Sequence, residues 1–185
     1  LKKRLWQQLV NSKIDNQIAI LERHNADRKT IVDLGVLRRR VRSGDPDNME
    51  AQAARQYWPA LMGRTFRRER EAGGINALLN YGYTVLRAAT ARAVCAQGLH
   101  PALGLHHGSR VNPFALVDDL MEPFRPMVDS IAHSGVGGET DLTVLKKRKL
   151  AAILQEDMLL NIGLSPVVNC LTRLAQSLTT SLSLG

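Results

Sequence analysis

Two adjacent histidines and three nearby acidic residues are the side chains in this sequence whose types and spacing could hold a metal ion. His106 and His107 precede a short polar loop, and Asp118, Asp119 and Glu122 follow it within five positions. Imidazole and carboxylate together are typical ligands of a borderline-to-hard divalent cation, whereas a thiolate-rich set would suit zinc. We therefore expect manganese or magnesium. The pattern alone is not specific, because acidic residues also favour the first turns of a helix.

The acidic residues are expected to lie on one short helix. Asn112 is a favourable N-cap and Pro113 fits a first helical turn, so the helix should begin there. At helical spacing, Glu122 can meet both Asp118 and Asp119 across one turn. Two prolines directly after this turn should end or kink the helix. The spacing thus predicts two carboxylates held close together beside the loop that carries the histidines.

A further carboxylate, Glu50, is expected on the inward face of another helix. Gly44 can end the preceding helix, Asp45 can cap the next one and Pro46 fits its first turn. The residues that should be buried on the same stripe as Glu50 are Ala53, Ala54, Tyr57, Trp58 and Leu61. Because a buried carboxylate is costly unless it is paired or bound to a metal, Glu50 is either a functional ligand or the partner of one of the many arginines.

The elements that must position these side chains are all predicted to be helices. Apolar residues recur at helical spacing over the ranges 1–24, 28–41, 75–96 and 140–160, and a last helix is expected from Pro166. No strand pattern and no repeat is visible. A chain of 185 residues is long enough for one hydrophobic core. We therefore predict an all-α, multi-helix domain over residues 1–185, with a possible flexible linker at 134–138.

The charge of the chain favours a polyanionic partner. Lys and Arg number 25 against 17 Asp and Glu, which gives a net charge of +8. Arginines cluster at 38–42 and again at 64–70, where the loop is either a solvated surface or a phosphate contact. No apolar run approaches the length of a membrane span and no signal peptide is visible, so we expect no membrane partner. Cys95 and Cys170 are interpreted as small buried side chains of a cytoplasmic protein.

Several ordered motifs resemble the CRISPR-associated endonuclease and integrase family Cas1. These motifs are Leu5–Val10, Lys13–Gln17, Asn48–Ala51, Ala54–Trp58, Asn76–Tyr83, Gly104–His107 and Asp118–Pro126. The adjacent histidines and the Asp-Asp-Leu-Met-Glu-Pro run are most similar to members from type II systems. The likeness extends from residue 1 to about residue 130 and is weaker over the tail.

The resemblance implies a metal-dependent DNA endonuclease and strand-transfer enzyme that inserts new spacer DNA into a CRISPR array during antiviral defence. The metal ligands of the family fall on Glu50, His107 and Glu122, and Asp119 is implied as a fourth catalytic participant. The implied cofactor is Mn²⁺ or Mg²⁺. His106 is given no assigned role, so it either supports the ligands from behind or contacts a DNA phosphate.

The resemblance also implies partners: duplex or branched DNA, as spacer precursor and repeat, a Cas2 subunit, and a second copy of the protein. Members of the family carry an N-terminal β-rich domain, which we expect to be absent from this sequence. The sequence begins at Leu1 without an initiator methionine, so we expect it to be a piece of a longer protein. Two alternatives stay open from the residues alone. One is a non-catalytic helical DNA-binding module, and the other is a helical metal-dependent hydrolase of small phosphate esters.

Overall fold

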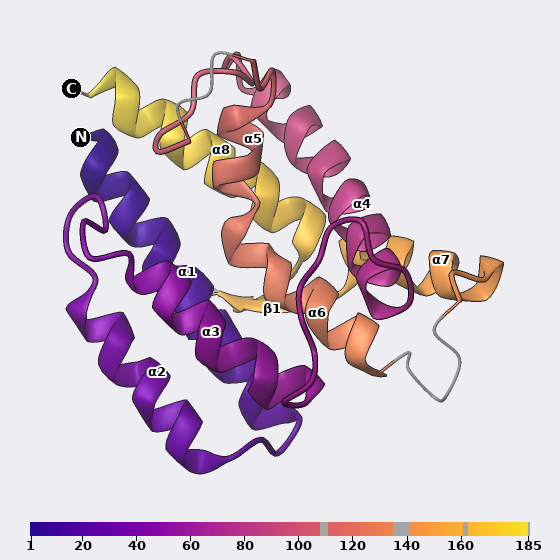
Figure 1. Cartoon of the computed structure of the whole chain (residues 1–185). Helices are drawn as coiled ribbons and strands as arrows, with labels where there is room; N and C mark the ends of the chain where they lie inside the picture. Colours follow the sequence, from indigo (N-terminus) through magenta and orange to yellow (C-terminus); the bar gives the residue numbers. More distant parts are fainter. Residues whose placement is uncertain (108–110, 135–140, 161–162, 185) are drawn as a thin grey trace.

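Helices dominate the computed structural model, which describes residues 1–107, 111–134, 141–160 and 163–184 (Figure 1). The helices are α1 (Lys2–Arg23), α2 (Arg28–Arg40), α3 (Met49–Met62), α4 (Ile75–Ala96), α5 (Ala115–Leu120), η1 (Glu122–Phe124), α6 (Arg125–Ser134), α7 (Val144–Ala151), η2 (Ala152–Gln155) and α8 (Val167–Ser183). The only strands among these residues are β1 (Asp157–Leu160) and β2 (Gly163–Pro166), which pair antiparallel with Asp157 opposite Pro166. The predicted all-α fold class is confirmed.

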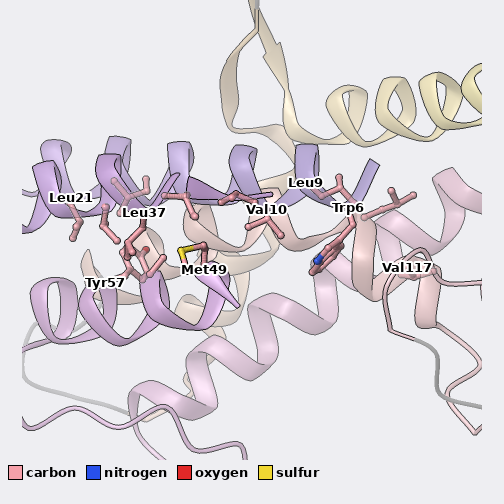
Figure 2. Packing of buried hydrophobic residues seen from close by; sticks show 14 of the residues in the cluster. Trp6, Leu9, Val10, Leu21, Leu37, Met49, Tyr57 and Val117 are labelled. Carbon is pink, nitrogen blue, oxygen red and sulfur yellow. The ribbon is translucent and has the colours of Figure 1, made fainter. Parts of the chain in front are cut away.

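Two hydrophobic clusters organise the helices. In the first, α1, α2 and α3 pack side by side through residues such as Trp6, Leu21, Leu37 and Tyr57, all less than 9 % exposed (Figure 2). The second cluster is built around α4, which packs against α6, α7 and α8. Helix α5 and η1 lie between the two clusters, since α5 contacts α1, α4 and α8. The acidic segment of the sequence is therefore placed where the two halves of the fold meet.

The long helices follow the sequence pattern closely. Helices α1, α2 and α4 occupy nearly the ranges that apolar periodicity predicts. Helix α4 begins directly after Gly74, whose φ of 64° few residues other than glycine adopt. Close packing explains why position 82 is a glycine. A Cβ atom at Gly82 would lie only 2.4 Å from Cγ1 of Val128. The glycine thus allows α4 and α6 to approach each other closely.

The start of α3, the helix that carries Glu50, differs from the prediction. Helix α3 begins at Met49 rather than near Pro46, because Asn48 adopts a left-handed conformation and acts as the N-cap. Asp45 still contributes, since its buried carboxylate accepts hydrogen bonds from the backbone N–H groups of Met49 (2.8 Å) and Glu50 (3.0 Å). These bonds fix the first turn of α3 and so the position of Glu50.

The predicted helix over 140–160 is wrong in its second half. Helix α7 ends at Ala151, and β1 then pairs with β2. A short apolar run is compatible with either a strand or a helix, and here the pairing with β2 decides. The prediction for Cys95 is also wrong, because this thiol is exposed, whereas Cys170 is buried as expected.

Two further expectations concern the linker and the membrane. Helix α6 includes Ser134, and the rest of the predicted linker, residues 135–138, lies outside the described residues. Within the described ranges, no helix combines the length and the apolar character needed to cross a bilayer.

Candidate active site

Asp119 fixes the loop that carries His107. Its carboxylate is fully buried and accepts hydrogen bonds from the backbone N–H groups of Leu105 (2.7 Å) and His106 (3.0 Å), and from Nδ1 of the His107 ring. The loop passes so close to α5 that a Cβ on Gly104 would lie 3.1 Å from an Asp119 oxygen and 2.6 Å from the His107 carbonyl oxygen. Since Asp119 engages Nδ1, the Nε2 atom of His107 is the ring nitrogen left for a ligand.

The electrostatics of His107 show which groups surround it. The hydrogen bond with Asp119 raises the pKa of His107 above its ordinary value, although partial burial opposes the charged form. The negative charges of Glu122 and Glu50 raise this pKa further. His107 therefore lies within electrostatic reach of both carboxylates.

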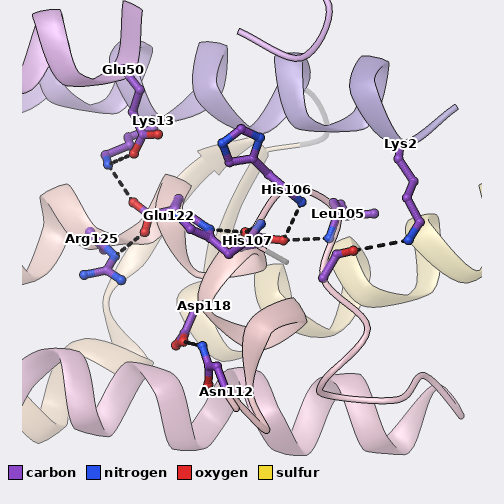
Figure 3. A network of polar contacts seen from close by, with 12 residues as sticks. Lys2, Lys13, Glu50, Leu105, His106, His107, Asn112, Asp118, Glu122 and Arg125 are labelled. Atoms are coloured by element: carbon purple, nitrogen blue, oxygen red, sulfur yellow. Dashed lines mark hydrogen bonds and ion pairs between the residues drawn. The ribbon is translucent and has the colours of Figure 1, made fainter. Parts of the chain in front are cut away.

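Lys13 joins Glu50 to Glu122. Its ammonium Nζ lies 2.5 Å from Oε1 of Glu50 and 2.6 Å from Oε2 of Glu122, and Arg125 pairs with the other oxygen of Glu122 at 2.8 Å (Figure 3). The Lys13 and Glu122 side chains are only 13 % and 8 % exposed. The structure thus gathers Glu50 from α3 and Glu122 from η1 around one buried cation from α1.

The charge states of this cluster depend on mutual pairing. Burial alone would raise the pKa of Glu122, but the nearby charges of Lys13 and Arg125 outweigh burial and hold the pKa below its ordinary value. Burial likewise disfavours the Lys13 ammonium, yet Glu122 and Glu50 raise its pKa. Glu122 is consequently held as an anion between two cations.

The donor set fits a divalent cation in its chemistry. Two carboxylates and an imidazole suit Mn²⁺ or Mg²⁺. The Lys13 ammonium lies between the two carboxylates and supplies the positive charge that a metal ion would supply there. Among the described residues, no three His, Cys, Asp or Glu side chains already surround one point as a metal site. The assignment of Glu50, His107 and Glu122 as metal ligands stays a prediction.

His106 packs against the core of the domain. Its ring stacks on the buried Trp6 ring with centroids 4.3 Å apart and an interplanar angle of 3°. The edge of Trp6 also meets His107, with centroids 5.5 Å apart. Of the two roles left open for His106, these contacts favour support of His107 from behind.

Asp118 does not belong to the acidic cluster, and the expected start of its helix is wrong. Helix α5 begins at Ala115, and Asn112 instead donates a hydrogen bond to Asp118 (2.8 Å). Arg87 of α4 pairs with the same carboxylate at 2.6 Å, and together these contacts lower the pKa of Asp118 despite its burial. Asp118 therefore faces α4, while Glu122 faces α1, so the predicted meeting of Asp118 with Glu122 does not occur.

Two features of the site escaped the sequence pattern. Lys13 lies four residues before the buried Gln17 and so on the same inward face of α1, although a lysine usually lies on an exposed face. Asp129 is fully buried near Arg125 and accepts hydrogen bonds from the hydroxyls of Tyr57 (3.1 Å) and Tyr83. This burial raises the pKa of Asp129 to about 7.

The arginine-rich loop before α4 is partly structural. Arg68 donates hydrogen bonds to the side-chain oxygens of the buried Asn76 (2.9 Å) and of the partly buried Asn80 (2.6 Å). Arg67 donates to the carbonyl oxygens of Arg64 and Phe66. The exposed guanidinium groups of the loop remain compatible with a phosphate contact.

Comparison with known proteins identifies the family. The family model for the CRISPR-associated protein Cas1 matches residues 2–157. The chain belongs to the Cas1 family. The matched range contains all the residues of the candidate site.

Relatives of this Cas1-family chain extend the comparison. A CRISPR-associated endonuclease Cas1 from Neisseria meningitidis is 49 % identical over 129 residues, which cover 70 % of this chain and 42 % of the relative. The chain thus spans less than half the length of that curated relative. A casposase bound to an integration product superposes with a TM-score of 0.73 at 20 % identity, over 98 % of this chain and 64 % of the casposase. A Cas6-RT-Cas1–Cas2 complex superposes with a TM-score of 0.78 at 23 % identity, over 98 % of this chain and 24 % of that one.

Proposed function

We propose that this chain is the catalytic part of a metal-dependent DNA endonuclease and integrase that inserts new spacer DNA into a CRISPR array. The observation that carries the proposal is the convergence of Glu50 and Glu122 on one buried cation beside His107. Carboxylates that are far apart in sequence are rarely buried together unless a positive charge holds them. Membership of the Cas1 family and the endonuclease named as its relative from Neisseria meningitidis support the same activity.

Glu50, His107 and Glu122 would hold Mn²⁺ or Mg²⁺ in this proposal. Such an ion, when bound, polarises a phosphodiester and activates water or a 3′ hydroxyl for in-line attack. Asp119 contributes by orienting the His107 ring through Nδ1 and by pinning the loop backbone. The contact between Asp119 and Nδ1 fixes the orientation of the His107 ring before any ligand binds.

The cations of the site serve the substrate as well as the carboxylates. Lys13 and Arg125 place positive charge beside the acidic cluster, where a DNA phosphate must approach. Without them, the carboxylates would repel the negatively charged strand. The site is thus built to accept an anionic substrate despite its acidic ligands.

The proposed partners are DNA, a Cas2 subunit and a second copy of the protein. The net charge of +8 supports binding to DNA, and the integration product of the casposase and the Cas2 subunit of the structural neighbour support the first two partners. Binding through phosphates predicts that log affinity falls with log salt by about 0.9 per phosphate contacted on B-DNA.

The test compares two variants that should fail in different ways. His107→Ala removes a proposed ligand, so cleavage and strand transfer in Mn²⁺ should be lost while DNA binding survives. Arg67→Ala removes a proposed phosphate contact and two hydrogen bonds within its own loop but no member of the acidic cluster, so binding should weaken modestly and activity should recover at higher DNA concentration. Wild-type activity in His107→Ala would refute the mechanism. DNA binding without any metal-dependent cleavage in the wild type would favour the non-catalytic module instead.

A further inference from the structure

A cavity at the far end of α1 from the candidate site has no role in the proposed function. Its volume is about 360 Å³, and it lies between the end of α1, the end of α6, and α7. The lining residues with charged or titratable side chains are Arg23, His24, Lys146, Lys149 and Glu156. Three permanently basic side chains thus face a single carboxylate.

Two of the basic side chains that line this cavity, Arg23 and Lys149, are not neutralised by the described residues around them. Within the part of the chain that the structure describes, neither Arg23 nor Lys149 has an ion-pair partner. Lys13 and Arg87, by contrast, each pair closely with a carboxylate. The charges of Arg23 and Lys149 beside a concave surface attract anions, because the cavity walls focus the field.

His24 and Ser130 add hydrogen-bonding groups to the lining of the same cavity, and His133 contacts His24 without being part of the lining. Nε2 of His24 lies 2.8 Å from Oγ of Ser130, and the His133 ring packs against His24 at 72° with centroids 4.5 Å apart. Nδ1 of His133 is buried and has no hydrogen-bond partner among the described residues. Arg23 and His133 also lower the pKa of His24, after burial, which agrees with a positive local potential.

We propose that this cavity binds a phosphate group. A guanidinium, an ammonium and a hydroxyl are the donors that phosphate oxygens prefer, and the volume admits a group as large as a nucleotide. His24 follows Lys13 by three turns of α1, so the cavity lies about 16 Å along the helix on the same stripe as the candidate site. The phosphate could thus belong to a DNA strand that reaches the site or to a free phosphate compound.

The test follows the imidazole proton signals of His24 and His133 by NMR during two titrations at constant ionic strength. One titration uses inorganic phosphate and the other a short single-stranded oligonucleotide, with sodium chloride as the reference. The signals should shift with a saturating dependence in at least one titration. A response to the oligonucleotide at far lower concentration than to phosphate identifies a DNA strand as the source, and a response to phosphate alone identifies a free compound.

A matched pair of variants controls for charge. Arg23→Gln with Lys149→Gln should weaken the saturating response about tenfold or more, because two charged donors are lost. Arg39→Gln with Arg40→Gln removes the same charge from the exposed end of α2 and should leave the response within about twofold. Equal weakening in both variants, or no saturating shift in the wild type, would overturn the proposal. Neither result would affect the proposed nuclease function, which rests on other residues.

Discussion

Replacing Lys13 by methionine tests whether one ammonium holds the acidic cluster together. The substitution keeps most of the buried side-chain stem but removes the charge between Glu50 and Glu122. Loss of one partner from a buried ion pair costs about 3 to 5 kcal/mol. Arg125 still pairs with Glu122, and the Glu50 side chain is 21 % exposed and can regain water, so we expect the lower end of that range.

The assay is urea unfolding followed by circular dichroism, with Arg38→Met as the control. Arg38 pairs with Asp15 at 3.0 Å, but both side chains are more than 40 % exposed, so its loss should cost about 0.5 kcal/mol. A loss for Lys13→Met below about 1 kcal/mol, or equal losses in both variants, would refute the reasoning about burial.

Manganese adds a second readout of the same variant. If Glu50 and Glu122 take up a divalent ion, the ion replaces the missing ammonium and should stabilise Lys13→Met more than the wild type, where Lys13 must first move away. Ligand present at a hundred times its dissociation constant raises the free energy of unfolding by about 2.7 kcal/mol. An equal gain in both proteins would show that Lys13 does not compete with the metal.

Two further predictions concern packing and pH. Gly82→Ala should lower the free energy of unfolding by about 1 to 3 kcal/mol, because its Cβ would collide with Val128, whereas Gly73→Ala has no neighbour within 4 Å and should be nearly neutral in the same urea assay. Because the pKa of Asp129 is raised, the folded protein keeps a proton that the unfolded chain releases. The free energy of unfolding of the wild type should therefore fall relative to that of Asp129→Asn as the pH rises from about 4 to 7, by about 3 kcal/mol in all. A difference that did not change with pH would contradict the raised pKa that burial gives Asp129.

The sequence predicts most readily what local periodicity controls. The start of α4 follows from Gly73 and Gly74 and from the long apolar pattern after them. The inward face of Glu50 follows from its spacing to Tyr57 and Leu61, both of which are buried. In each case neighbouring residues in the chain carry enough information to orient a side chain.

Contacts between distant segments could not be predicted in the same way. Nothing near Lys13 specifies that Glu50 and Glu122 will meet it, and the stacking of His106 on Trp6 joins α1 to a loop from the other half of the chain. The hairpin of β1 and β2 was missed because its short strands depend on each other and have no periodic signal of their own. These features arise from tertiary packing, which overrides local preference.

Binding of Mn²⁺ to the purified protein tests the central claim most directly. Electron paramagnetic resonance of free Mn²⁺ would be recorded during titration of the wild type, Glu50→Gln, His107→Ala and Glu122→Gln, with Asp118→Asn as a control carboxylate that faces α4. The account predicts that each of the three site variants binds Mn²⁺ at least about tenfold more weakly than the wild type, whereas Asp118→Asn is unchanged. Wild-type affinity in all three site variants would contradict the account.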